Sequence, residues 1–351
     1  MRMLLTQLLR SDPRIRVLGT AEDGEAALAF LERNHPDVVL MDVNMPRLNG
    51  LEATRRIMAT RPLPVVICSA VHRASEVSAT FDALDAGAVA FLEKPPSPAH
   101  PEFGVKVREF LRTVIAMAGV NAPVPGAANG ATLAANIPSL PAGMTAESIR
   151  VVAVGGSLGG PQALQAVLRE WPRNLPVPVL VALSVAAGFL GVVVERLRTV
   201  TGLAVSVAEA GALAEPGRIY FAPEGTQMRV AADGRLALHR ETAADGPPGN
   251  VVAPLLQSVA ENFGAGAIGI LLSGPGKDGA AELKLMRERG AVTIAQDAAS
   301  AVVHGMPGEA IRLGAATHVF SPVQAGAAVA AWLRPRAGAA AEVAGGRQNP
   351  A

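Results

Sequence analysis

Short apolar runs alternate with amphipathic segments along the first third of the chain. A short apolar run bounded by turn residues is typical of a buried strand, and apolar positions three and four residues apart are typical of a helix. Their alternation predicts βα units around a parallel sheet. Strands are expected at 16–20, 38–42, 64–70 and 88–94, and helices at 1–9, 24–34, after Gly50, around 76–86 and at 103–118. The series opens with a helix, whereas a doubly wound sheet normally opens with a strand.

A change of composition divides the chain in two. Residues 121–148 are rich in Pro, Ala, Gly and Asn without a sustained period, which marks a linker. Beyond it, RVVAVGGS, VPVLVALS, AIGILLSG and AVTIAQD predict a second parallel sheet, and residues 208–240 predict an antiparallel edge or hairpin. We therefore expect an α/β protein with two parallel-sheet domains, at 1–120 and 149–335, and a disordered tail at 336–351.

Charge and cysteine content narrow the functional classes. The 31 basic and 30 acidic residues nearly cancel, so charge gives no reason to expect a nucleic-acid or membrane-surface partner. Cys68 is the single cysteine, which excludes an internal disulfide and a multi-cysteine metal site and fits a cytoplasmic protein. The N-terminal MRMLLTQLLRSDPR is too short and too interrupted for a secretory signal.

The uncharged stretch 177–194 reaches the lower length limit of a membrane helix, which leaves a membrane protein as one alternative. Its β-branched first half predicts instead a buried strand followed by a turn and a helix, without membrane insertion. The residues that divide the stretch are Pro178, Ser184, Gly188 and Gly191.

Three polar residues follow successive predicted strands in the first domain. Asp42 ends VVLMD, Ser69 lies in VVICSA, and Lys94 ends FLEK. Functional groups of a doubly wound sheet collect outside the carboxyl ends of its strands, so one site can hold all three.

This order closely resembles that of response-regulator receiver domains, which have a flavodoxin-like fold. The resemblance implies that Asp42 accepts phosphate from a histidine kinase, that Lys94 pairs with the acyl phosphate, and that Ser69 bonds a phosphate oxygen. The family also has a first strand ending in an acidic pair that holds Mg²⁺. Here only Asp42 and the Asn44 carbonyl remain for the metal, so we expect weak Mg²⁺ binding. We expect that a translation start placed too far downstream, rather than a natural deletion, accounts for the missing strand. Mass spectrometry of the native N-terminus would test this expectation.

A second site begins where strand, glycine turn and helix follow one another in VVAVGGSLGGPQAL. The turn contains G-x-S-x-G, in which Ser157 stands between Gly155 and Gly159. Glycines permit the sharp turn, and the amides of the following helix can stabilise an oxyanion. Asp278 lies in a glycine-rich loop after a later strand.

Together GGSLGG, YFAPEG, SGPGKDGA and AQDAASAVVHGMP resemble the catalytic domain of the chemotaxis methylesterase CheB family. The resemblance implies a doubly wound domain in which Ser157 is the nucleophile and Asp278 the orienting acid of a Ser-His-Asp triad. It also implies that the chain hydrolyses glutamate methyl esters and deamidates glutamines on methyl-accepting chemotaxis receptors. No cofactor is expected in this domain.

The sequence departs from the family at the base of the triad. Ser184 stands where the family has its histidine, Gln227 replaces a usual histidine, and Leu158 replaces a usual threonine. A serine hydroxyl does not take up a proton at neutral pH as imidazole does, so Ser157 lacks its general base. His304, in VVHGMP after a strand end, is a speculative substitute.

Two functional hypotheses therefore stay open besides the membrane alternative. The first is a methylesterase controlled by receiver phosphorylation, and the second is a catalytically impaired relative that binds receptors or the kinase. Methanol release from methylated receptor separates them. The remaining histidines lack metal-ligand spacing and predict no zinc site, namely His35, His72, His100, His239 and His318.

Overall fold

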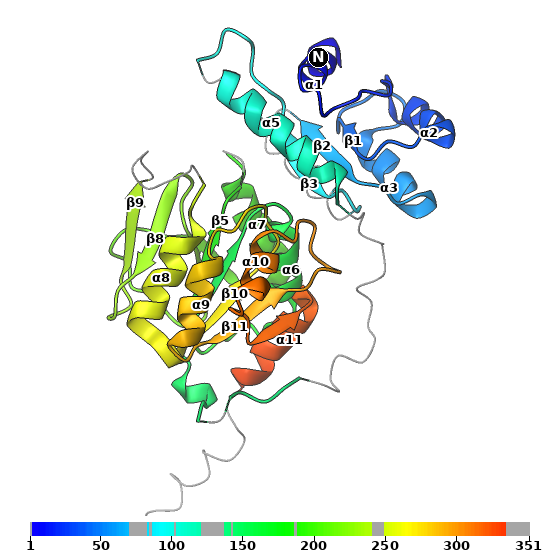
Figure 1. The fold of residues 1–351 in the computed structure, drawn as a ribbon. Coiled ribbons are helices and arrows are strands. Elements are labelled where there is room, and N and C mark those ends of the chain that lie inside the picture. Colours follow the sequence, from blue (N-terminus) through cyan, green and yellow to red (C-terminus); the bar gives the residue numbers. More distant parts are fainter. Residues whose placement is uncertain are drawn as a thin grey trace, which may run out of the picture.

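The computed structural model contains two separate parallel sheets joined along one chain (Figure 1). It describes residues 2–69, 83, 86–101, 103–120, 137–141, 143–185, 188–240 and 249–334. Most of the helix expected around 76–86, most of the linker and the whole tail at 336–351 lie outside these residues. Within them, no helix has the length and apolar character needed to cross a bilayer.

The first sheet has three strands in the order β1-β2-β3, all parallel. Four of its five predicted helices are confirmed, the one around 76–86 lying mostly outside the described residues, and two of the four begin at side-chain caps. Asp23 accepts from Ala26 N at the start of α2, and Asn49 accepts from Glu52 N at the start of α3. The elements are α1 (Arg2–Arg10), α2 (Gly24–Arg33), β1 (Val39–Met41), α3 (Gly50–Thr60), β2 (Val65–Ser69), β3 (Ala90–Glu93) and α5 (Phe103–Ala118).

The strand expected at 16–20 is the one predicted strand of this half that the described structure does not form. These residues lie between α1 and α2 without regular secondary structure. A strand requires a neighbour to receive its backbone hydrogen bonds, and no other described strand pairs with this segment.

The second sheet has seven parallel strands in the order β12-β11-β10-β4-β5-β7-β6. Its elements are η2 (Ala146–Ser148), β4 (Val151–Gly156), α6 (Gly160–Arg169), β5 (Val179–Leu183), α7 (Leu190–Thr201), β6 (Ala204–Val207), β7 (Arg218–Phe221), β8 (Thr226–Val230), β9 (Leu236–Arg240), α8 (Val252–Phe263), η4 (Gly264–Gly266), β10 (Ala267–Leu271), α9 (Ala280–Glu288), β11 (Val292–Gln296), α10 (Met306–Arg312), β12 (His318–Phe320) and α11 (Pro322–Trp332). The chain therefore resumes βα alternation after residue 150, as its apolar runs predict.

The segment 208–240 follows its prediction only in part. β8 and β9 form the expected antiparallel hairpin, with Met228 opposite Leu238. β7, in contrast, pairs in parallel with both β5 and β6 and extends the main sheet. The uncharged stretch 177–194 forms β5 and the start of α7, so the predicted strand and helix are confirmed. Residues 186 and 187 between them lie outside the described residues.

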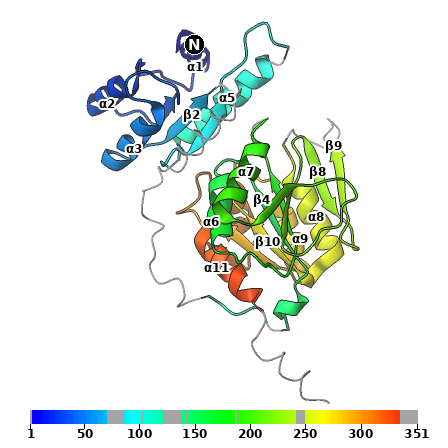
Figure 2. The ribbon, with the colours of Figure 1, turned by 180° about the vertical axis from the view of Figure 1, so that it is seen from behind.

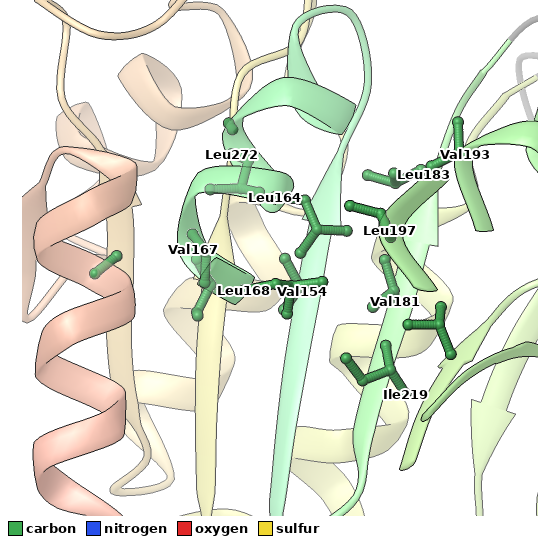
Figure 3. Close-up of a cluster of buried hydrophobic side chains, with 14 of the residues drawn as sticks. Val154, Leu164, Val167, Leu168, Val181, Leu183, Val193, Leu197, Ile219 and Leu272 are labelled. Atoms are coloured by element: carbon green, nitrogen blue, oxygen red, sulfur yellow. The ribbon is translucent and has the colours of Figure 1, made fainter. Parts of the chain in front are cut away.

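Helices cover both faces of the seven-stranded sheet, as the opposite views in Figures 1 and 2 show. α6, α7 and α11 pack on one face, and α8, α9 and α10 pack on the other together with the β8–β9 hairpin. Figure 3 shows Leu164 and Leu168 of α6 facing Val154 and Val181 of the two central strands. These side chains are almost fully buried, which fixes the strand ends that carry the polar residues described below.

Aromatic and aliphatic contacts join the two sheets. The rings of Phe91 in β3 and Phe189 before α7 stack with their centroids 5.1 Å apart and an interplanar angle of 8°. Leu158 and Val302 pack against the buried cluster on the α5 face of the first sheet. The rim of the second sheet that holds Ser157 is therefore in contact with the first.

Candidate functional site

Three residues singled out from the sequence lie at the carboxyl ends of three adjacent strands. Ser157 follows β4, Ser184 follows β5, and Asp278 lies in the loop after β10. The chain leaves β4 toward β5 and later returns to β10 on its other side, so β4 marks the topological switch point of the sheet. Ligand sites of open α/β sheets form at such points.

Close backbone packing shapes the turn at Ser157. Gly159 has φ of +79°, and a side chain there would meet Val302 and Ser273 at less than 3 Å. A Cβ on Gly274 would lie 2.9 Å from the Ser157 Cβ. Glycine is therefore required at positions 159 and 274, because a larger residue at either position would displace the neighbouring atoms.

Ser273, at the end of β10, holds this turn in place. Its carbonyl accepts from Ser157 N at 2.9 Å, and its hydroxyl donates to Leu158 O at 2.7 Å. Its own N–H donates to the Gln296 side chain at 2.7 Å. Sequence reasoning did not identify Ser273 or Gln296, because their role depends on contacts between neighbouring strands.

Two amides of the turn remain available for an anionic oxygen. The N–H groups of Leu158 and Gly159 donate no backbone hydrogen bond to any residue that the structure describes. They lie directly before α6, where the helix N-terminus also favours negative charge.

The hydroxyl of Ser157 donates to the Ser184 carbonyl at 3.1 Å. The Ser184 position is therefore adjacent to Ser157, as a triad base must be, although it carries no imidazole. Gln227 is buried in β8, and its amide nitrogen donates to Asn250 O at 3.3 Å.

Asp278 is hydrogen-bonded to the start of α8. Its two carboxylate oxygens accept from Val252 N at 3.0 Å and Ala253 N at 2.9 Å. Burial raises the pKa of this carboxyl, and the two backbone N–H groups oppose the rise. The carboxylate is positioned as a helix cap within the site, which sequence reasoning alone did not anticipate.

His304 lies next to the Ser157 turn through a parallel bridge with Gly274. Its Nε2 atom is 3.2 Å from the Gln296 carbonyl oxygen, and a Cβ on Gly308 would lie 2.9 Å from its Nδ1. One ring nitrogen therefore has a backbone partner, and the other packs against α10. The role of His304 as a substitute base stays a prediction.

In the first sheet, Asp42, Ser69 and Lys94 also come together. Lys94 Nζ lies 2.5 Å from Asp42 Oδ2, and Lys94 N donates to the Ser69 carbonyl at 3.1 Å. Ser69 is only 2% exposed. Burial also raises the pKa of the neighbouring Cys68 thiol to about 12, so this thiol is not a reactive group.

The residues around Asp42 do not fit a bound Mg²⁺. Mg²⁺ prefers several oxygen ligands in octahedral geometry, and the described residues contain no group of three or more acidic, histidine or cysteine side chains that could hold a metal. Asn44 donates its backbone N–H to Asp42 Oδ1 at 3.3 Å. The nearby Glu22 and Asp23 carboxylates form ion pairs with Arg47.

Comparison with known proteins agrees with this geometry. Residues 152–329 match the model of the CheB methylesterase family, and residues 1–100 match that of the response regulator receiver domain. A "protein-glutamate methylesterase/protein-glutamine glutaminase 4" of Geobacter metallireducens is 45% identical over 328 residues, 92% of each chain. A protein-glutamate methylesterase/protein-glutamine glutaminase of Nitrosospira multiformis is 42% identical over 91% of this chain and 90% of its own. The CheB methylesterase catalytic domain of Thermotoga maritima covers 52% of this chain and 98% of its own, with 28% identity and a TM-score of 0.48.

Proposed function

Because this chain belongs to the CheB methylesterase family and carries a receiver domain, we propose that it hydrolyses glutamate methyl esters on chemotaxis receptors. The same site would deamidate receptor glutamines, and the protein would act in the cytoplasm. The observation that supports this most directly is Ser157, held in a glycine turn between β4 and α6 with Ser184 and Asp278 at the neighbouring strand ends.

The reaction would proceed through an acyl-enzyme. Ser157 Oγ attacks the ester carbonyl carbon and gives up its proton, and the carbonyl oxygen becomes an oxyanion near the Leu158 and Gly159 amides. The C–O bond to the methoxy group breaks, and methanol leaves with a proton. Water then attacks the acyl-serine, which releases the glutamate carboxylate and restores the Ser157 hydroxyl.

Removal of the proton from the Ser157 hydroxyl limits the expected rate of ester hydrolysis. The hydroxyl bonds the Ser184 carbonyl, which accepts a hydrogen bond but is not a base at neutral pH. Loss of a triad histidine costs about a million-fold in turnover in a serine protease. We therefore expect hydrolysis to be slow and to depend on the oxyanion site.

A second candidate function is binding without catalysis. Two observations favour it, namely Ser184 at the base position and the commitment of both Asp278 oxygens to the start of α8. In this alternative the protein would still dock onto receptors or onto the chemotaxis histidine kinase. Its receiver would take part in docking, with Asp42 phosphorylation weakened by the poor Mg²⁺ site.

Methanol release separates the two candidates. The purified full chain would be incubated with methylated receptor, with and without a small-molecule phosphodonor, beside Ser157→Ala. Slow methanol release that disappears in Ser157→Ala supports the esterase. Release that is equal in both proteins, together with saturable receptor binding, establishes the non-catalytic alternative.

His304→Ala tests the substitute base in the same assay. If His304 takes the proton from Ser157, turnover should fall in this variant. Unchanged turnover in this variant would exclude the role, and the backbone contact of the ring with Gln296 leads us to expect that result.

A further inference from the structure

The two free amides of the Ser157 turn, on Leu158 and Gly159, take their direction from the carbonyl on the other side of each peptide bond. The peptide bonds of the described residues are all trans, so a carbonyl and the N–H of the next residue point in opposite directions. The Ser157 carbonyl accepts from Gly160 N at 2.8 Å. The Leu158 N–H therefore points away from Gly160.

The direction of the Gly159 N–H depends on a side chain instead. It shares a peptide plane with the Leu158 carbonyl, and no backbone N–H of the described residues donates to this carbonyl. Its partner is the Ser273 hydroxyl, which donates to Leu158 O at 2.7 Å. The Ser273 hydroxyl thus fixes the side of the turn on which the Gly159 N–H lies.

The Ser273 hydroxyl is itself held in one orientation. Val303 N donates to Ser273 Oγ at 2.9 Å. The other acceptor within reach, Val303 O, lies 3.3 Å away and already accepts from Gly274 N at 3.0 Å. A hydroxyl has one proton to donate, and the shorter contact with Leu158 O is the stronger one.

Removal of this hydroxyl would leave the Leu158 carbonyl without its donor. Ser273 is fully buried, so bulk solvent does not reach the vacated position. A buried carbonyl without a partner is costly, and rotation of its peptide plane toward another donor lowers that cost. Such a rotation would turn the Gly159 N–H away from its present direction.

We propose that Ser273 is a positioning residue for ester hydrolysis, because its hydroxyl orients the Leu158–Gly159 peptide so that the Gly159 N–H faces the oxyanion formed when Ser157 attacks. The proposal rests on the proposed function, since that function makes Ser157 the nucleophile. Ser273 acts through the peptide group and not by contact with the ester. Amides stabilise an oxyanion best when they are aimed before the reaction begins.

The strand β11 offers a matched hydroxyl as a control. Thr293 is also fully buried, and its Oγ1 donates to Ala315 O at 2.7 Å and accepts from Thr317 N at 3.0 Å. Ser273→Ala and Thr293→Val each remove one buried hydroxyl that bonds one backbone carbonyl and one backbone N–H. Both variants should therefore lose about 2–4 °C in Tm.

The chemical measurement is acetylation of Ser157 by p-nitrophenyl acetate in the full chain. Ser157 Oγ bonds the acetyl carbon, the bond from that carbon to the nitrophenyl oxygen breaks, and nitrophenolate leaves as an anion. The serine proton passes to hydroxide at mildly alkaline pH. This leaving group needs no proton, so the reaction tests the oxyanion site without the missing base. Nitrophenolate absorbance gives the rate, peptide mass mapping gives the acetylated residue, and Ser157→Ala gives the background.

Ser273→Ala is expected to slow acetylation of Ser157 by about tenfold or more, because one oxyanion donor is worth about 100-fold to 1,000-fold in rate and this variant misdirects it. Thr293→Val should react at the rate of the natural chain despite its similar loss of Tm. Ser273→Thr returns the hydroxyl and should restore the rate. Equal rates in Ser273→Ala and Thr293→Val, or a natural chain whose Ser157 is not acetylated, would overturn the proposal.

A carbonyl signal tests the orientation without any reaction. In protein labelled with ¹³C at leucine carbonyls and ¹⁵N at glycine, coupled signals come only from the four Leu–Gly peptide bonds, one of which is Leu158–Gly159. Leu158→Met identifies its signal by removing it. Ser273→Ala should shift this signal, and Thr293→Val should leave it in place. An unchanged signal in Ser273→Ala would overturn the proposal, even where the added methyl group unfolds Ser273→Thr.

Methanol release from methylated receptor keeps the two proposals apart. A chain that releases no methanol, while acetylation of its Ser157 depends on Ser273, would contradict the proposed function and leave the positioning role intact. Methanol release at equal rates from the natural chain and from Ser273→Ala would contradict the positioning role and leave the function intact.

Discussion

At the scale of single residues, Ser184 has the largest effect on the chemistry of the site. Its carbonyl already accepts from the Ser157 hydroxyl, and its own hydroxyl lies 3.1 Å from the place where a Cβ on Gly249 would be. The absence of a side chain on Gly249 leaves space beside position 184. Under the proposed function, position 184 is where the missing base would stand.

Ser184→His is expected to increase hydrolysis. An imidazole at this position would lie beside Ser157 and act as a general base, which contributes about 100-fold to 10,000-fold in rate. Methanol release from methylated receptor measures the gain, and the rate should rise with pH through the range near 6.5 in which histidine loses its proton. Ser184→Ala is the matched control and should show no gain. Equal rates for both variants would show that the remaining groups of the site are not catalytically arranged.

A second residue-scale prediction concerns acid stability. Burial lowers the pKa of His318. Its ring stacks on Phe320 with centroids 5.1 Å apart, and it meets the Trp332 ring at a tilt of 38°, with centroids 5.3 Å apart. Because the folded pKa is below the unfolded value of 6.5, the unfolded state binds the proton first, and stability falls as pH drops through this range. His318→Phe keeps the ring stack without the titration. When the pH is lowered from 7.5 to 5.5, the Tm of this variant should fall less than the Tm of the natural chain. An equal fall in both proteins would contradict this assignment.

At the scale of elements, the N-terminus of α7 depends on one side chain from a distant loop. Both carboxylate oxygens of Glu224 accept backbone N–H groups, from Gly188 and Leu190, each at 2.8 Å. A carboxylate at this end of a helix bonds unsatisfied amides and opposes the positive end of the helix dipole. Glu224 thus connects the loop after β7 to the segment that carries Phe189.

Glu224→Gln is expected to destabilise the protein by about 1 kcal/mol, because the amide replaces one of the two acceptors and removes the charge. Chemical denaturation of the full chain measures the change. Glu209→Gln is the control, since Glu209 is exposed and its side chain does not cap a helix. A loss equal to that of the control would exclude the capping role.

The elements also show what local sequence can predict. The helix 103–118 is predicted residue for residue because its apolar positions recur at helical spacing over four turns. The segment 16–20 has the same apolar character as a strand but lacks a pairing partner, and pattern alone does not reveal that absence. β6 and β12 are short edge strands, so few residues mark them in the sequence.

The residues of the candidate site likewise divide into those that local sequence predicts and those that it does not. Ser157, Ser184 and Asp278 follow three adjacent strands, and local sequence indicates this position because strand ends and glycine turns are local features. Ser273 and the helix cap made by Asp278 are not predictable, because their partners come from residues more than 20 positions away in sequence. Hydrogen bonds between distant loops require the folded arrangement of the sheet.

At the scale of the whole molecule, the ring stack of Phe91 and Phe189 connects the two sheets. Phe91 lies on β3, three residues before Lys94, and Phe189 directly precedes α7. The ring stack therefore joins the strand that leads to the Asp42–Lys94 ion pair to the rim of the second sheet, and we expect it to stabilise the contact between the two domains.

A double-mutant cycle of Phe91→Leu and Phe189→Leu is expected to give a coupling energy of about 0.5–1.5 kcal/mol, the usual value for an aromatic pair. Thermal or chemical unfolding of the full chain provides the four stabilities. A cycle of Phe91→Leu and Phe263→Leu is the control, because Phe263 packs against the cluster on the other face of the second sheet. Additive effects in the first cycle would show that the stack does not stabilise the pair of domains.

The two tryptophans of the second domain connect its last helix to earlier parts of the chain. Trp332 in α11 donates to Pro138 O at 2.7 Å, and Trp171 donates to Gly326 O at 3.1 Å. Chain ends that meet in space are the requirement for circular permutation. A circularly permuted gene would join residue 334 to residue 137 through a short linker and place the new chain ends in the exposed turn at Asp233. It should therefore encode the same seven-stranded fold with a new order of its strands.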